Sequence, residues 1–233
     1  MSFMLIYAKQ PIYYLINNYP QMIKTLYLAK EIEKKEYSRL MKMGFEVKRV
    51  PNEAAQKMCK NASHQGFLAE VSDFKPHTYQ LFLKKKFVLV LSGLTDVGNI
   101  GAIVRSAYAL GVDAIIACGV KQLAFDGITR SSTGALFDMP FAIEPNVHDV
   151  LNDFKMSGFT LYGAEMGGTD IRDVKIQEKR VLVLGSEGEG LSSRVVSKLD
   201  EVVSIKMEND FNSLNVSVAG AILMDRMRIG EEN

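Results

Sequence analysis

Hydrophobic and polar positions alternate over the first 73 residues in short blocks that predict a small α/β unit. Alternation with a period of two, as in 45–50, is typical of a half-buried strand, whereas the charges spread along 31–43 indicate an exposed helix. That helix should end near Gly44, because glycine readily adopts the left-handed turn that closes many helices. The predicted strands cover 3–7, 24–29, 45–50 and 66–71, and the predicted helices cover 11–18, 31–43 and 52–60.

A second α/β pattern begins with the continuous apolar run 87–94, which is typical of a strand buried in a parallel sheet. Further strands are predicted over 113–118, 141–143, 160–164, 181–184 and 202–205, alternating with helices over 99–110, 147–156, 192–198 and 213–228. This alternation predicts a mostly parallel sheet covered by helices on both faces. We therefore expect an α/β protein with a small domain over 1–73, a linker over 74–86 and a larger domain over 87–233.

The last predicted helix lies in the stretch 205–228, which carries no charge over 211–224. We expect it to be capped by Asn212 or Ser213 and buried on nearly all sides, since charge returns only in its last turns. Ser213 and Asn215 then need partners, because an unpaired buried polar group costs about 1–3 kcal/mol. They either cap the helix locally or line a site, and this stretch alone leaves both interpretations open.

The composition of the 233-residue chain is ordinary for a globular protein. It contains two cysteines, Cys59 and Cys118, which lie far apart and are expected to be reduced thiols of a cytoplasmic protein. No uncharged run exceeds the length of 211–224, which is shorter than the roughly 18 residues needed to span a membrane, so no membrane partner is expected. The three histidines show no metal-ligand spacing, and we expect no metal.

Charge is distributed unevenly along the chain. Residues 1–86 contain 15 Lys and Arg against 7 Asp and Glu, a net charge of +8, whereas the remainder has a net charge of −7. A basic region of this size is either a set of solvated helix faces or a surface for nucleic acid. If nucleic acid binds, we expect the N-terminal part to hold most of it.

Two glycine-rich segments follow predicted strands, at the strand ends where open α/β sheets bind ligands. The segment 96–111 lacks the glycine spacing of a dinucleotide-binding loop. The segment 182–192 has Gly185 and Gly190 spaced as in a phosphate-binding loop, but Leu191 stands where that loop needs lysine. Backbone N–H groups beside carboxylates suit a cationic or hydroxyl-rich ligand instead.

Three segments, taken together and in chain order, resemble the motifs of one enzyme family. They read N-I-G-A-I-V-R-S-A over 99–107, L-G-S-E-G-E-G-L over 184–191 and S-L-N-V-S-V-A over 213–219. They are similar to the motifs of the SpoU/TrmH family of RNA ribose 2′-O-methyltransferases. The N-terminal part, with H-Q-G-F-L-A-E-V over 64–71, resembles the ribosomal-protein-like α/β substrate-binding domain of one branch, which includes 23S ribosomal RNA guanosine methyltransferases.

The resemblance implies a SPOUT catalytic domain whose deep C-terminal trefoil knot holds S-adenosylmethionine. Patterning alone would not predict a knot, because knotted chains are very rare. The residues implied to contact the methyl donor, mostly through backbone groups, are Gly185, Ile205 and Leu214. The residues implied to line the reaction site are Asn99, Arg105, Glu187, Ser213 and Asn215.

The resemblance also implies a homodimer with composite active sites at the interface, and RNA as the substrate. The chain departs from the family pattern at Val97 and at Lys206, where proline is usual. Neither change removes a functional side chain, although both can loosen a loop. Ribosomal RNA is the expected substrate, and transfer RNA is the alternative. A non-catalytic RNA-binding or ribosome-assembly protein on the same scaffold is the alternative of another class.

Overall fold

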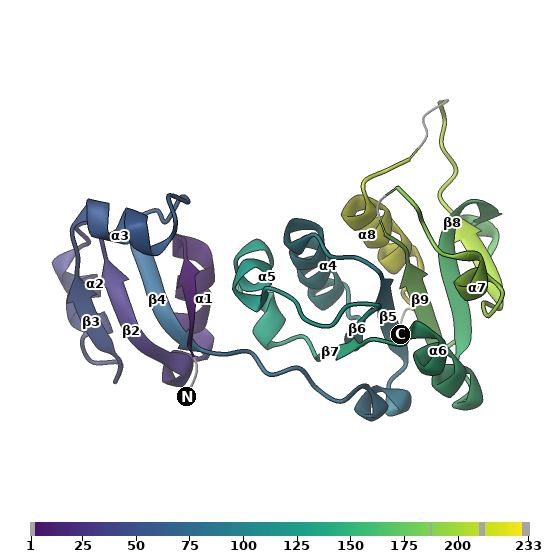
Figure 1. The fold of residues 1–233 in the computed structure, drawn as a ribbon, viewed down its shortest axis with the longest axis horizontal. Helices are drawn as coiled ribbons and strands as arrows, with labels where there is room; N and C mark the ends of the chain where they lie inside the picture. Colours follow the sequence, from purple (N-terminus) through teal and green to yellow (C-terminus); the bar gives the residue numbers. More distant parts are fainter. Residues whose placement is uncertain (1–2, 187, 210–212, 230–233) are drawn as a thin grey trace. The chain divides into compact units, whose positions relative to one another are not determined.

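The computed structural model describes residues 3–186, 188–209 and 213–229, and it divides into two compact units (Figure 1). Unit 1 comprises Met1–Lys75 together with Ala124–Phe137, and unit 2 comprises Pro76–Leu123 together with Asp138–Asn233. The sequence did not lead us to expect Ala124–Phe137 in the first unit. The domain boundaries at 73 and 87 stay a prediction.

Unit 1 contains a four-stranded sheet in the order β1-β4-β2-β3. Strand β4 (Phe67–Ser72) is antiparallel to β1 (Phe3–Tyr7) and to β2 (Ile23–Leu28), and β2 is parallel to β3 (Glu46–Arg49). All four strands fall where the alternating pattern predicted them. The helical segments of the unit are α1 (Lys9–Asn18), η1 (Pro20–Met22), α2 (Lys34–Leu40), α3 (Asn52–Met58), α5 (Phe125–Ser131) and η3 (Ala135–Phe137).

Strand β4 shows why the sheet of unit 1 is covered on both faces. Its residues Phe67, Ala69 and Val71 pack in the main hydrophobic cluster, which also contains buried residues of α1 and α2. The intervening Leu68 packs in a second cluster with Ala55 of α3. Successive side chains of a strand point to opposite faces, so each face of the sheet is buried under helices.

Unit 2 contains a six-stranded sheet in the order β10-β8-β9-β5-β6-β7, and every pair of neighbours is parallel. The mostly parallel α/β sheet predicted from the apolar runs is confirmed. Its strands are β5 (Phe87–Ser92), β6 (Ala114–Cys118), β7 (Phe141–Glu144), β8 (Thr160–Asp170), β9 (Arg180–Leu184) and β10 (Glu201–Ser204).

Helices cover both faces of this sheet as well (Figure 1). Helix α6 (Val147–Met156) packs in one cluster with Val88 and Val90 of β5. On the other face, a Cβ atom on Gly220 of α8 would lie 2.8 Å from the Leu184 side chain of β9, so α8 approaches the sheet closely there. The other helical segments of the unit are η2 (Tyr79–Lys84), α4 (Val97–Ala109), η4 (Ile171–Asp173) and α7 (Ser193–Val196).

The segment expected as a linker is partly built into unit 2. Within it, the η2 residue Phe82 is buried, and the Tyr79 hydroxyl donates a 2.7 Å hydrogen bond to the carboxylate of Asp153 on α6. Burial and this carboxylate raise the pKa of Tyr79 to about 12, so its hydroxyl stays protonated and keeps donating. Among the described residues, no helix has the length and apolar character needed to cross a membrane.

The last helix begins later than predicted. Helix α8 (Val216–Arg226) has Asn215 as its N-cap, and the Asn215 side chain accepts a hydrogen bond from the backbone N–H of Ser217. The prediction that Ser213 starts or caps the helix is therefore wrong, and Asn212 lies outside the described residues. Asn215 can cap this helix because its side-chain oxygen reaches one of the free N–H groups of the first turn.

Helix α8 is also less buried than predicted. Gly220, Leu223 and Met224 face the interior, but Val218 and Ile222 are 48% and 36% exposed. A residue and its neighbour four positions on lie on one side of a helix, so Val218 and Ile222 form an apolar stripe on the outer side. The uncharged sequence of α8 thus forms both a buried inner side and an exposed apolar outer side.

Candidate functional site

A cavity of about 880 Å³ lies in unit 2 beside the middle of strand β8, where strands β9 and β10 end and α8 begins. Its walls come from residues 164–167, 203–207 and 213–216, from Ala219 and Leu223 of α8, and from the glycine-rich loop after β9. This is the carboxyl edge of a parallel sheet, where such folds bind ligands. The predicted site residues that line the cavity are Gly185, Ile205, Ser213, Leu214 and Asn215.

The glycine-rich loop closes on itself directly after β9. Ser186 and Gly190 exchange two backbone hydrogen bonds, with N···O distances of 3.2 and 3.1 Å. A Cβ atom on Gly185 would lie 2.2 Å from the carbonyl carbon of Gly190, so a larger residue at 185 forces the loop to move. Gly190 has φ +65°, a conformation that glycine adopts without strain. The loop therefore brings backbone groups to the edge of the cavity.

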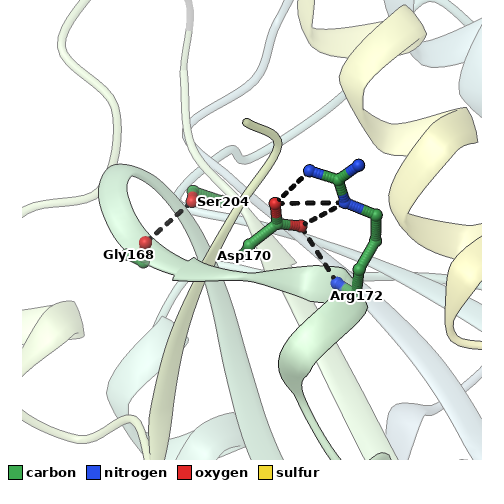
Figure 2. A network of polar contacts seen from close by, with 4 residues as sticks. All are labelled: Gly168, Asp170, Arg172 and Ser204. Atoms are coloured by element: carbon green, nitrogen blue, oxygen red, sulfur yellow. Dashed lines mark hydrogen bonds and ion pairs between the residues drawn. The ribbon is translucent and has the colours of Figure 1, made fainter. Parts of the chain in front are cut away.

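Another wall of the cavity is an excursion of strand β8 (Figure 2). In the pairing with β10, Gly163 lies opposite Val202 and Thr169 lies opposite Val203, so residues 164–168 leave the regular ladder. Figure 2 shows the carbonyl oxygen of Gly168 accepting a 2.8 Å hydrogen bond from the hydroxyl of Ser204. The excursion is thus tied to β10 where it returns to the sheet.

An ion pair fixes the end of the same excursion (Figure 2). The Asp170 carboxylate accepts a 3.0 Å hydrogen bond from the backbone N–H of Arg172 and pairs with its guanidinium, with an Nη2–Oδ2 distance of 2.6 Å. Hydrogen bonds from the Arg172 side chain and backbone lower the pKa of Asp170 to about 2. Asp170 therefore stays ionised at neutral pH, where it can keep its ion pair with Arg172 at the end of β8.

The excursion brings into the cavity a carboxylate that sequence reasoning missed. Glu165 lines the cavity, and its Oε1 accepts a hydrogen bond from the backbone N–H of Leu191, at the end of the glycine-rich loop. The available signal was its position directly after a predicted parallel strand, where polar residues gather at the ligand-binding edge. The length of the excursion, however, could not be read from that pattern.

Asn99 and Asn215 join the first and third motifs. The Asn215 side-chain amide donates a 3.0 Å hydrogen bond to the side-chain oxygen of Asn99, across 116 positions of sequence. Each asparagine sits at the start of a helix: Asp96 caps α4 by accepting a 2.7 Å hydrogen bond from the Asn99 N–H, and Asn215 caps α8. Both interpretations of Asn215, local cap and site residue, therefore apply together.

Arg105 lies on α4, about one and two-thirds turns beyond Asn99 in an ideal helix. Its side chain is exposed and forms no ion pair with any residue that the structure describes. Arg105 is not among the described residues that line the cavity, and Glu187 lies outside the described residues. The catalytic and donor-binding roles of all eight predicted residues stay predictions.

Comparison with known proteins identifies the family. Residues 86–225 match the family model described as the SpoU rRNA Methylase family. The chain belongs to the SpoU methylase family. Residues 5–77 match a second model, described as RNA 2′-O ribose methyltransferase substrate binding. The first match contains all three motifs together with the cavity, so the geometry described above belongs to the methylase part.

Curated relatives of this methylase include proteins assigned to the TrmH family of tRNA/rRNA methyltransferases. A protein of Staphylococcus epidermidis is 36% identical over 173 residues, which is 70% of each chain. A protein of Staphylococcus haemolyticus is 30% identical over 215 residues, 87% of this chain and 86% of the relative. The similarity therefore extends over most of both units.

Solved structures show the same fold. The SpoU methyltransferase AviRb from Streptomyces viridochromogenes in complex with AdoMet has a TM-score of 0.79 at 24% identity, covering 97% of this chain and 89% of that one. A TrmH/SpoU tRNA modifying enzyme of A. aeolicus has a TM-score of 0.55 at 28% identity and covers 62% of this chain and 74% of that one. Only the first of these likenesses extends over nearly the whole chain.

Family membership confirms that this protein is an RNA methyltransferase, as its motifs predicted. The predicted cofactor, S-adenosylmethionine, is confirmed: the chain belongs to a family of methylases, and the SpoU methyltransferase AviRb is solved in complex with AdoMet. Among the described residues, no group of three or more His, Cys, Asp or Glu could hold a metal ion. The trefoil knot, the homodimer and the identity of the RNA stay predictions.

Proposed function

We propose that this methylase transfers a methyl group to the 2′-hydroxyl of a ribose in ribosomal RNA, with S-adenosylmethionine held in the cavity of unit 2. The hydrogen bond between Asn215 and Asn99 carries the proposal, because it joins two of the three motifs beside that cavity. The match of residues 86–225 to a ribosomal RNA methylase model supports the ribosomal substrate. The transfer RNA alternative is supported by the name of the A. aeolicus structure and by the curated relatives, which are described as tRNA/rRNA methyltransferases.

The cavity fits the donor in size and chemistry. Its volume of about 880 Å³ lies within the usual range of small-molecule pockets, and Ile205 and Leu214 give it apolar walls that would suit the apolar part of the donor. The glycine-rich loop and the excursion of β8 bring backbone polar groups and the Glu165 carboxylate to its edge. Bound there, S-adenosylmethionine supplies an electrophilic methyl group on a positively charged sulfur.

The protein's own residues must orient the ribose and stabilise charge at its 2′-oxygen. Asn99 and Asn215 hold each other in place, so both amides are positioned before RNA arrives. Arg105, on the same helix as Asn99, can hold an RNA phosphate and the developing alkoxide with its planar fork of N–H donors. Such positioning accounts for several kcal/mol of the activation barrier in comparable reactions.

Unit 1 is proposed to bind the RNA through its phosphate backbone, at nucleotides other than the one that is methylated. The Lys9 ammonium lies 5.6 Å from the centre of the Tyr13 ring, the Tyr13 and Phe67 rings are 5.4 Å apart, and the Lys30 ammonium lies 4.8 Å from the centre of the Phe67 ring. These four residues form a lysine–aromatic cluster where β1 and β2 end and β4 begins. Exposed lysines attract the phosphate backbone of RNA.

A homodimer is proposed as the working form. The exposed apolar side chains of Val218 and Ile222 on α8 and of Tyr108 on α4 support it. Helices α8 and α4 pack together, and they carry the site residues Asn215 and Asn99 at the N-cap of α8 and in the first turn of α4. We expect the chain to sediment at twice its mass of 26.0 kDa, and Ile222→Asp to shift it toward the monomer. The introduced carboxylate would have to be buried without a partner. A wild-type protein that sediments as a monomer at micromolar concentration would contradict the proposal.

Mapping ribose methylation in cellular RNA with and without the gene tests the substrate. We expect one 2′-O-methyl mark on ribosomal RNA to disappear in the deletion strain and to return when the wild-type gene is restored. Loss of a transfer RNA mark instead would support the transfer RNA alternative. Loss of no mark would favour the non-catalytic RNA-binding alternative.

A further inference from the structure

The β8 excursion places one carboxylate, that of Glu165, at the wall of the cavity. We propose that Glu165 makes the cavity select the positively charged methyl donor over the neutral product left after transfer. This inference rests on the proposed function, because it takes the cavity as the donor site. It concerns a residue outside the three motifs and adds a specificity role to the same site.

The position of Glu165 is fixed from both sides. The five residues 164–168 leave the β8–β10 ladder. Where the chain returns to the sheet, it is held by the hydrogen bond from the Ser204 hydroxyl to the Gly168 carbonyl and by the ion pair of Asp170. A Cβ atom on Gly168 would lie 2.6 Å from the carbonyl oxygen of Val202, so the backbone at Gly168 packs too closely against β10 to leave room for a side chain. Glu165 therefore reaches the cavity from a segment whose return to the sheet is fixed by these contacts.

The two oxygens of the Glu165 carboxylate have different surroundings. Oε1 accepts the hydrogen bond from the Leu191 N–H and so holds the end of the glycine-rich loop. No described residue donates a hydrogen bond to Oε2, and no described cation forms an ion pair with this carboxylate at the cavity wall. One oxygen positions the loop, and the other is available to a ligand.

Glu165 is better placed to act on a ligand's charge than the other charged residues that line the cavity. Those described are Glu189 and Lys206, and both are exposed, whereas Glu165 is half-buried. Solvent and salt screen exposed charges strongly and half-buried charges less. The field that a bound ligand experiences should therefore come mainly from Glu165 among these three residues.

The reaction removes one positive charge from the ligand. S-adenosylmethionine carries a sulfonium, an ammonium and a carboxylate, a net charge of +1. In transfer, the bond between methyl carbon and sulfur breaks, its electron pair stays on sulfur, and a bond forms from the methyl carbon to the ribose oxygen, whose proton passes to solvent. S-adenosylhomocysteine is left as a neutral thioether with net charge zero. A carboxylate at the cavity thus favours donor binding and product release.

Calorimetric titration of the full-length protein with S-adenosylmethionine and S-adenosylhomocysteine tests the proposal. Glu165→Gln keeps an oxygen for the Leu191 N–H and removes the charge, so we expect donor affinity to fall about three- to tenfold and product affinity to change less than about twofold. Glu165→Ala also removes the loop contact, so both affinities should fall. The matched control Glu178→Gln removes an exposed charge just before β9, at its opposite end, and should change neither.

An unchanged ratio of the two affinities in Glu165→Gln would overturn the proposal. If both affinities fell equally, Glu165 would only position the loop. If both affinities were unchanged, Glu165 would have no role in recognising either ligand. A wild-type protein that binds neither ligand, or whose donor binding survives Gly185→Trp, would instead refute the donor site itself. The two failures are therefore distinguishable.

Discussion

Replacing Arg105 with alanine is expected to reduce methyl transfer to RNA about a thousandfold or more. Donor affinity should stay within about twofold of the wild type, because Arg105 is not among the described residues lining the cavity. Its exposed position on α4, the helix that begins beside Asn99, instead suits contact with RNA. Loss of the rate without loss of donor binding is the pattern of a group that acts on the substrate oxygen.

Arg105 is better interpreted as an electrostatic clamp than as a base. A guanidinium keeps its proton near neutral pH and presents N–H donors in a rigid fork that matches phosphate. It can therefore stabilise the developing alkoxide and a neighbouring phosphate together, while the proton leaves to solvent. Arg105→Lys keeps the charge but not the fork, so its rate should lie between those of the wild type and Arg105→Ala.

Single-turnover transfer of a labelled methyl group to RNA measures the rate, and calorimetric titration measures donor binding. Arg194→Ala is a suitable control, because Arg194 is an exposed arginine on α7 in the same unit and does not line the cavity. We expect the control to keep both properties. Parallel loss of rate and donor affinity in Arg105→Ala would show that Arg105 supports the cavity rather than the reacting oxygen.

The sheet of unit 2 and the edge that carries its cavity could be predicted from patterning. Strands such as β5 are apolar on both faces, and only a parallel sheet between two helical layers buries such strands completely. The carboxyl edge then follows from strand direction, which places Gly185 and Ile205 at one end of the sheet. These features depend on periodicity and chain direction, and both are local properties.

Features set by long-range contacts could not be predicted. The start of α8 depends on which of several polar residues caps it, and Ser213 and Asn215 both have suitable side chains. The structure selects Asn215, whose amide is held by Asn99 far away in the sequence. Glu165 was missed for a similar reason, since only the register shift between β8 and β10 carries it to the cavity.

Reversing Lys9 and Lys30 to glutamate is expected to weaken RNA binding about a hundredfold when combined, and about tenfold singly, near 0.1 M salt. Both ammonium groups are exposed on the lysine–aromatic cluster, so each can contact a phosphate without desolvating other charges. Glu36, which is hydrogen-bonded to Tyr13, does not cancel them, because its carboxylate pairs with Arg39 at 2.8 Å. Donor binding in unit 2 should be unaffected.

Filter binding of a ribosomal RNA transcript at several salt concentrations measures this effect. Each lost phosphate contact should reduce the slope of log affinity against log salt by about 1. Lys24→Glu is the matched control: Lys24 lies near the start of β2 over the Phe3 ring, whereas Lys30 lies beyond the end of β2 over the Phe67 ring. If RNA affinity depends only on the net positive charge of the N-terminal region, the three single reversals will weaken binding equally. A larger loss at Lys9 and Lys30 than at Lys24 would place the RNA at the lysine–aromatic cluster, because the change in net charge is the same in each variant.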